Sequence, residues 1–149
     1  MTDRGEGPVL ALDVGDARIG VAVSDPDRRV AVPVGTIRTG APDDLKAVRA
    51  LVERHGATTI VVGLPLSMSG RPGTRAAHAE AFADALRAFI PAVAVVTHDE
   101  RLSTVEAERA LRDAGAPGRR RRRVVDRSAA AVILQSYLDG LRGDGSRGR

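Results

Sequence analysis

The sequence predicts a single α/β domain, with a mixed β-sheet and helices packed on both faces of that sheet. Three observations lead to this prediction. The chain has 149 residues, and about 100 to 200 residues is the usual length of one domain. Three β-rich runs open the sequence with only turn-like residues between them. Helix-like and strand-like segments then alternate, which predicts β-α-β crossovers after an antiparallel start.

The opening runs predict three antiparallel strands. Residues 9–13 form a short apolar run that ends in an acid, and residues 19–24 form a second run after a Gly-containing turn. Two such runs on either side of a short turn are typical of a β-hairpin. A third β-rich run, residues 30–37, contains Pro33. Because proline cannot donate to a strand ladder, this run should be an edge strand or contain an irregularity.

Two helices and two strands should follow in alternation. Apolar residues recur at helical spacing over residues 42–55, and Gly56 is a typical helix stop. Residues 58–62 are short and β-branched, which favours a strand. Helical spacing returns over residues 74–90, and residues 93–97 resemble a second buried strand.

The last part of the sequence predicts two more helices. Ser103 and Glu106 match the S-x-x-E capping box, so a helix should begin there and end before Gly115. A final helix shows the clearest helical periodicity in the chain. We place the domain at residues 1–142 and expect the Gly/Arg/Ser-rich tail, residues 143–149, to be disordered. The apolar face of the final helix consists of Ala130, Ile133, Leu134, Tyr137, Leu138 and Leu141.

The composition argues against several classes of protein. No cysteine is present, which removes disulfides, thiolate metal sites and thiol catalysis. Aromatic residues make up only 2% of the chain, whereas RRM and single-strand OB-fold proteins stack bases on exposed aromatic rings. We find no signal-peptide-like start and no apolar run of membrane-spanning length. We therefore expect a cytoplasmic protein that does not insert into a membrane.

Three acids lie beside apolar sequence, where a solvated acid is not expected. Asp13 ends the first predicted strand, and Glu100 follows the strand at residues 93–97. Ligands of open α/β sheets bind at the carboxyl ends of parallel strands, so these two acids should meet at one edge if their strands are neighbours. Asp126 precedes Ala130 by four residues and Ile133 by seven, which places it on the inward face of the final helix.

Convergence of three carboxylates would require a cation. Like charges brought together raise their pKa values and cost stability, and hard oxygen ligands select Mg²⁺ or Mn²⁺. Each acid also has a purely structural alternative. Asp126 could cap its helix, and Asp13 could support the hairpin turn. Glu100 could pair with Arg101 or Arg18. Because three unrelated coincidences would then be needed, we predict that Asp13, Glu100 and Asp126 are catalytic and bind the metal.

The basic residues are almost all arginine, and their distribution matters more than the net charge of +4. A block of consecutive arginines is a common footprint for nucleic-acid phosphates, although a solvated basic loop is an alternative. Arg18 and Arg101 lie beside the predicted acids, and we expect them to contact nucleic acid together with this block. The block consists of Arg119, Arg120, Arg121, Arg122 and Arg123.

Four motif segments occur in a fixed order along most of the chain. They are Leu12-Asp13-Val14-Gly15 with Arg18-Ile19-Gly20-Val21-Ala22, then Val62-Gly63-Leu64-Pro65, then Asp99-Glu100-Arg101-Leu102-Ser103-Thr104, and Asp126 leading into Ala129-Ala130 and Ile133-Leu134-Gln135-Ser136-Tyr137-Leu138. With these segments the chain resembles the YqgF/RuvX family of pre-16S rRNA nucleases and Holliday-junction-resolvase-like proteins. A single Asp-x-Gly hairpin would be a weak match, whereas four ordered segments are specific.

The resemblance implies an RNase H-like fold whose catalytic acids are the same three that burial predicts. It also implies that the arginine block takes the place of a Lys/Arg-rich loop in relatives. The chain departs from the family pattern at Asp16 and Ala17 in the first hairpin. It departs again at Ser67 and Ser69, where relatives often have Asn and Asp. These departures concern loops that would contact substrate and leave the acids unchanged.

The predicted function is metal-dependent hydrolysis of phosphodiester bonds in nucleic acid. Asp13 would bridge two Mg²⁺ ions about 4 Å apart, with Glu100 and Asp126 each holding one of them. The favoured substrate is the 5′ end of pre-16S rRNA in a ribosomal precursor particle. One alternative is a four-way DNA junction, whose symmetric cleavage would suit a homodimer. Another is a non-catalytic RNA-binding factor on a nuclease scaffold.

An ATP site of the actin-like or sugar-kinase-like kind is a further class, because the same fold and a similar Asp-x-Gly hairpin hold nucleotide phosphates there. Such proteins close two domains of this fold around ATP. The present chain has the length of one such domain, which argues against this class.

Overall fold

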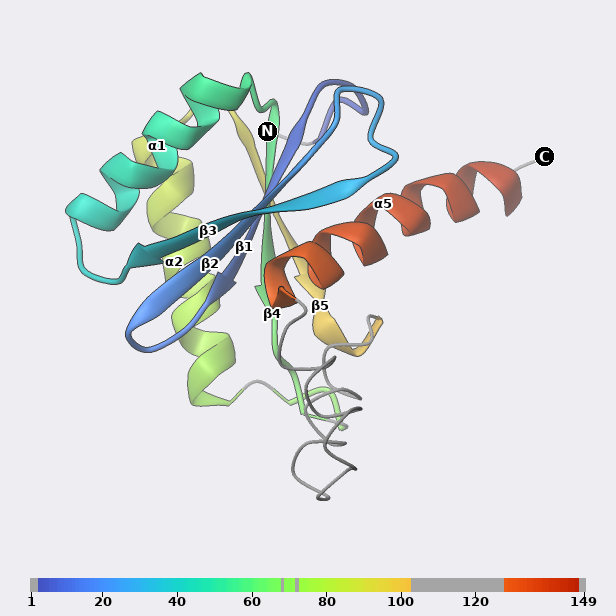
Figure 1. Cartoon of the computed structure of the whole chain (residues 1–149). Coiled ribbons are helices and arrows are strands. Elements are labelled where there is room, and N and C mark those ends of the chain that lie inside the picture. The colour runs from blue at the N-terminus through green and yellow to red at the C-terminus, as the bar shows by residue number, and fades with distance from the viewer. Residues whose placement is uncertain (1–2, 68, 72, 103–127, 148–149) are drawn as a thin grey trace, which may run out of the picture.

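The protein is a mixed five-stranded sheet with helices on both faces (Figure 1). The structure is a computed structural model that describes residues 3–67, 69–71, 73–102 and 128–147. The strands lie in the order β3-β2-β1-β4-β5, which confirms the predicted class of α/β domain. They are β1 (Val9–Val14), β2 (Arg18–Ser24), β3 (Ala31–Arg38), β4 (Thr59–Leu64) and β5 (Ala94–Asp99).

The antiparallel opening is confirmed. β1 pairs antiparallel with β2, and β2 pairs antiparallel with β3, which forms one edge of the sheet. Pro33 lies opposite Ala22, where the ladder between β2 and β3 shifts its register. Pro33 therefore occupies both an edge strand and an irregularity, the two positions where a strand tolerates proline.

The second half of the sheet is parallel. β1 pairs with β4, and β4 pairs with β5. Helix α1 (Asp43–His55) leads into β4, and helix α2 (Thr74–Phe89) leads into β5. α1 ends at the predicted stop, because Gly56 adopts a left-handed conformation with φ of 66° and donates its amide to the Val52 carbonyl. The carboxyl ends of β1, β4 and β5 consequently share one end of the sheet.

Helix α5 (Ala129–Arg147) covers the face of the sheet opposite to α1 and α2 (Figure 1). Strand residues alternate between the two faces, so the apolar core has two parts. The part beneath α1 and α2 includes Leu10, Leu12, Ile19, Val21, Val48, Ile60, Val62 and Leu86. The part beneath α5 comprises Val9, Ala11, Ala22, Val61, Ala130, Val132, Ile133, Leu134 and Leu138.

The final helix is longer than the sequence predicts. It passes Gly143 and ends at Arg147, because a glycine costs only about 1 kcal/mol relative to alanine inside a helix. Leu141, predicted on the buried face, is 38% exposed, since this part of α5 extends away from the sheet (Figure 1). The predicted helix that begins at Ser103 lies outside the described residues. Within the ranges that the structure describes, no helix is long and apolar enough to cross a membrane.

A buried ion pair fixes the N-terminal segment at the amino ends of β1 and β4. Arg28 Nη1 lies 2.7 Å from Asp3 Oδ2, and the two side chains are only 6% and 11% exposed. The Asp3 carboxylate also accepts hydrogen bonds from Thr59 Oγ1 at 2.8 Å and from the Tyr137 hydroxyl at 2.5 Å. Asp3 thereby joins the β2–β3 connection, β4 and α5.

The hydrogen bonds of Asp3 set the direction of its pKa shift. Burial alone would raise the pKa of this carboxyl, but donors on Arg28, Tyr137, Gly5 and Thr59 together hold the pKa well below its usual value. An acid with a lower pKa in the folded than in the unfolded chain stabilises the fold above its unfolded pKa of about 4. This contribution is lost as the pH falls below that value.

Replacement Asp3→Asn is expected to lower the free energy of unfolding at pH 7 by about 2 kcal/mol, because a buried arginine loses its charged acceptor. The melting temperature should fall by about 4 to 8 °C. Asp84→Asn is the matched control, since Asp84 forms an ion pair with Arg87 in which the side chains are 75% and 45% exposed; it should cost less than about 1 kcal/mol. The difference between Asp3→Asn and wild type should shrink below about pH 4. If the free energies of unfolding of Asp3→Asn and wild type differ by the same amount at pH 3 and pH 7, the stabilising role of the Asp3 carboxylate is contradicted.

Candidate active site

Asp13 projects from the end of β1 onto the face that α5 covers. Val9 and Ala11 are buried on that face, and Asp13 continues the same alternation. Its partner on β2 is Gly20. A Cβ built on Gly20 would lie 3.7 Å from both the Asp13 Cβ and the Ala130 Cβ. Because Gly20 and Ala130 are small, the Asp13 side chain reaches solvent and is 19% exposed.

Glu100 lies at the same end of the sheet but is almost fully buried. It begins the 3₁₀ turn η1 (Glu100–Leu102) after β5, and only 2% of the residue is exposed. A Cβ built on Gly63 of β4 would lie 3.1 Å from Glu100 Oε2 and 2.6 Å from Ile133 Cδ1. Glu100 and Ile133 therefore fill the space that a side chain at position 63 would occupy. Carboxylates buried to this extent are hydrogen-bonded, ion-paired or bound to a metal.

The two acids lie on either side of β4. β1 and β5 are not direct neighbours, because β4 pairs with both. Asp13 follows Leu12, and Leu12 pairs with Val62, the residue before Gly63. The missing side chain of Gly63 thus leaves room for the Glu100 carboxylate next to the end of β1. The two acids therefore lie at the same end of the sheet although their strands do not pair, because the strand between them has a glycine at this position.

Asp126, the third predicted acid, lies outside the described residues, as does the arginine block at residues 119–123. The chain resumes beside Asp13, because Ser128, Ala129 and Ala130 line the same cavity as Asp13. Among the residues that the structure describes, no three His, Asp or Glu side chains are grouped closely enough to hold a metal ion. A site of three carboxylates thus depends on Asp126 and stays a prediction.

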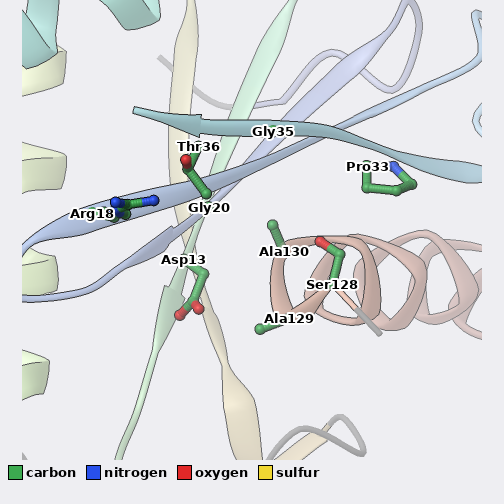
Figure 2. Close-up of a pocket in the computed structure, with 9 residues that line it drawn as sticks. All are labelled: Asp13, Arg18, Gly20, Pro33, Gly35, Thr36, Ser128, Ala129 and Ala130. Atoms are coloured by element: carbon green, nitrogen blue, oxygen red, sulfur yellow. The ribbon is translucent and has the colours of Figure 1, made fainter. Parts of the chain in front are cut away.

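An open cavity of about 410 Å³ lies between the β2–β3 hairpin and the start of α5 (Figure 2). Ser128 precedes the helix, and its Oγ accepts a hydrogen bond of 3.1 Å from the Ala131 amide. The cavity gives a ligand access to the Asp13 carboxylate. Its lining residues are mostly small or polar: Asp13, Arg18, Gly20, Pro33, Gly35, Thr36, Ser128, Ala129 and Ala130.

Two further arginines lie near the acids. Arg75, in the first turn of α2, places Nη2 4.0 Å from Asp13 Oδ1, and its side chain is 45% exposed. Arg101 forms an ion pair with Asp99, with Nη2 2.6 Å from Oδ2. The hydrogen bonds from the Arg101 side chain hold the pKa of Asp99 below its usual value. Arg75 is therefore the more available of the two for a phosphate.

Hydrogen bonds attach the turn that carries Glu100 to α5. His98 Nε2 lies 2.9 Å from Ser136 Oγ, and this hydroxyl donates to the Leu102 carbonyl at 2.9 Å. Because a hydroxyl has one proton to donate, the proton between His98 and Ser136 is on Nε2. Burial lowers the pKa of His98, against the opposing charge of Asp99, which favours a neutral ring. Glu100 is held between anchored residues on both sides.

Comparison with known proteins identifies the family. The RuvX family model, described as a Holliday junction resolvase, matches residues 7–140. The chain belongs to the RuvX family. The "Putative pre-16S rRNA nuclease" of Nocardia farcinica is 46% identical over 145 residues, which cover 93% of this chain and 81% of that protein. A protein of the same name from Nocardioides sp. is 49% identical over 141 residues, covering 92% and 90%.

A solved structure shares the fold of this RuvX-family chain. It is T. thermophilus RuvC in complex with a Holliday junction substrate, which matches with a TM-score of 0.53 over 92% of this chain and 96% of that chain. The sequence identity is 14%, so the likeness concerns the fold alone. The predicted RNase H-like fold is confirmed.

Two residues beside the acids of this RuvX-family chain were not among the predicted site residues. The sequence does mark Gly63, because a glycine in a strand often indicates the close approach of another group. It marks Arg75 more weakly. An arginine in the first turn of a helix is unfavourable next to the positive end of the helix dipole, which suggests a nearby anion. The anion is the Asp13 carboxylate, which the sequence does not place there.

Proposed function

We propose that this chain is a metal-dependent nuclease that hydrolyses phosphodiester bonds in the maturation of the 5′ end of pre-16S rRNA. The observation that carries the proposal is the burial of Glu100 against Gly63, at the same end of the sheet as Asp13. Family membership and the names of the relatives support nucleic acid as the substrate. We propose a cytoplasmic location, on precursor ribosomal particles.

The donor set at this end of the sheet fits a hard divalent cation. Asp13 and Glu100 offer carboxylate oxygens, which Mg²⁺ and Mn²⁺ prefer, and we propose Asp126 as the third ligand. A bound ion of this kind would supply activation of water and stabilisation of charge on the phosphoryl group. The chain's own residues then have distinct tasks. Glu100 is buried and fixed in direction, whereas Asp13 is reached from the cavity.

The arginines would bind the substrate. Guanidinium groups donate paired hydrogen bonds to phosphate oxygens. Arg75 lies 4.0 Å from Asp13, and Arg18 lines the same cavity as Asp13. We propose that Arg75 contacts the phosphate at the cleavage site and that Arg18 contacts the nucleic-acid backbone beside it. The arginine block at residues 119–123 precedes α5 and would extend this contact.

A four-way DNA junction is the second candidate substrate, because the matching family model is described as a Holliday junction resolvase. Symmetric cleavage of a junction would need two active sites related by a two-fold axis, and thus a homodimer. Trimming an rRNA end needs one.

The test incubates purified protein with end-labelled precursor 16S rRNA and with a labelled four-way junction, in Mg²⁺, in Mn²⁺ or in EDTA. We expect metal-dependent cleavage at the rRNA 5′ end, lost in Asp126→Asn. Asp139→Asn is the control, since Asp139 is an exposed acid of α5 whose side chain is 58% accessible, and it should keep full activity. Cleavage of the four-way junction without cleavage of the rRNA would show that the second candidate substrate is the correct one. Binding of both without cleavage would contradict the nuclease and favour a non-catalytic RNA-binding factor.

A further inference from the structure

The β2–β3 hairpin carries two arginines directly opposite each other. Arg18 of β2 pairs in register with Arg38 of β3, and both are exposed. Opposite residues of an antiparallel ladder project from the same face, with Cβ atoms about 5 Å apart, and like charges in such pairs are destabilising. The hairpin therefore places a local excess of positive charge at its end, which an anion would neutralise.

Within the ranges that the structure covers, neither Arg18 nor Arg38 forms an ion pair with an acid or a side-chain hydrogen bond. Several other arginines of the same ranges do have acidic partners, for example Arg87 with Asp84, Arg101 with Asp99 and Arg142 with Asp139.

One member of the pair lies at the cavity that contains Asp13, and the other lies next to it on the neighbouring strand. Arg18 lines this cavity, and Figure 2 shows Arg18 on one side of Asp13 and the start of α5 on the other. Arg38, as the ladder partner of Arg18, projects from the same face. Gly20, the ladder partner of Asp13, pairs with Thr36. Arg18 and Arg38 lie two residues further along the same two strands, which is about 7 Å along the strand direction.

We propose that Arg18 and Arg38 together bind a backbone phosphate of the nucleic-acid strand, adjacent to the phosphate at Asp13. The identity of the ligand as nucleic acid rests on the proposed function. Two guanidinium groups provide the donors for one phosphate and are relieved of mutual repulsion by its charge. Among the described residues, the lining of the cavity between Arg18 and α5 contains no aromatic side chain. The contacts proposed for the two arginines are to the backbone of the strand, and such contacts position a strand without reading its sequence.

The test measures binding in EDTA, so that cleavage plays no part. A fluorescent single-stranded RNA of about 12 nucleotides and a labelled four-way DNA junction are each titrated at several salt concentrations. Arg38→Ala is expected to weaken binding about 10-fold. The slope of log K against log salt should become less steep by about 0.7 for the single strand or about 0.9 for duplex DNA. Arg38→Lys should retain the wild-type slope.

Arg54→Ala is the matched control, because Arg54 is an exposed arginine in the last turn of α1, at the opposite end of the sheet. It should leave the slope unchanged. The melting temperature of Arg38→Ala should stay the same or rise, since repulsion with Arg18 is removed. An unchanged slope in Arg38→Ala, an equal loss in Arg54→Ala, or a lower melting temperature overturns the proposal.

The same measurements separate this proposal from the proposed function. If the salt dependence of binding becomes less steep in Arg38→Ala but the wild-type protein cleaves neither substrate with Mg²⁺, the proposed phosphate site is supported and the proposed nuclease activity is contradicted. If cleavage occurs and the slope is unchanged, the nuclease stands and the phosphate site does not.

Discussion

Asp13→Asn is expected to reduce metal-dependent cleavage by more than about 100-fold while leaving the fold intact. Loss of a residue that merely supports a metal ligand costs about 10- to 100-fold in metal affinity or activity, so loss of a ligand should cost more. The fold should tolerate the change, because Asp13 is partly exposed and asparagine has nearly the same shape.

Melting temperatures with and without Mg²⁺ give a measurement that is independent of activity. Ligand at ten times its Kd stabilises the folded state by about 1.4 kcal/mol, which corresponds to about 3 to 6 °C for a chain of this size. Wild type should show this shift, and Asp13→Asn should not. The control is Asp27→Asn, an exposed turn residue at the amino end of β1, which should keep the shift. A full Mg²⁺ shift in Asp13→Asn would contradict its role as a ligand.

Gly63→Ala should also reduce cleavage by about 100-fold, although the change adds one methyl group to a residue with no chemistry of its own. The new Cβ would meet Ile133 Cδ1 at 2.6 Å and Glu100 Oε2 at 3.1 Å. Either α5 or Glu100 must move, and overpacking of this kind costs about 1 to 3 kcal/mol. Because Glu100 occupies this space at the site, its carboxylate should lose the position that metal binding requires.

A double variant separates the two contacts of Gly63. Ile133→Val removes the Cδ1 atom, so Gly63→Ala combined with Ile133→Val should recover stability, whereas cleavage and the Mg²⁺ shift should stay low. Gly140→Ala is the control, since a Cβ there meets nothing within 4 Å; full activity and a small gain in stability are expected. Wild-type cleavage by Gly63→Ala would show that the position of Glu100 is not critical.

The parts of the fold that depend on local sequence could be predicted. The hairpin follows from short apolar runs on either side of a turn, and the edge position of the third strand follows from Pro33. The end of α1 follows from Gly56. The acids at positions 13 and 100 stand out because each directly follows an apolar run. The sequence alone does not give the strand order, so it predicts that the two acids lie close together only if their strands are neighbours. In the folded chain β4 lies between their strands, so the decisive residue is Gly63, whose role depends on side chains that are distant in sequence.

Other features could not be predicted because they depend on tertiary structure. The Asp3–Arg28 pair joins a polar N-terminal segment to a residue with a positive φ of 59°, and neither shows periodicity. The pairing of Arg18 with Arg38 depends on the register shift in β3. Extending the register of Val23 with Val32 would place Ile37 opposite Arg18. The shift moves Arg38 into that position.

The position of α5 has a consequence for how the chain folds during synthesis. Among the residues that the structure describes, all five strands are complete by Asp99, and the apolar cover of one face of the sheet comes from residues 129–147. At translation rates of about 5 to 20 residues per second, α5 is complete roughly 2 to 10 s after β5, and until then this face lacks the cover of α5. Contacts between α5 and β1 are also among the most distant in sequence, which slows their formation. The nascent chain should therefore be most prone to aggregation, and most in need of a chaperone, during this interval.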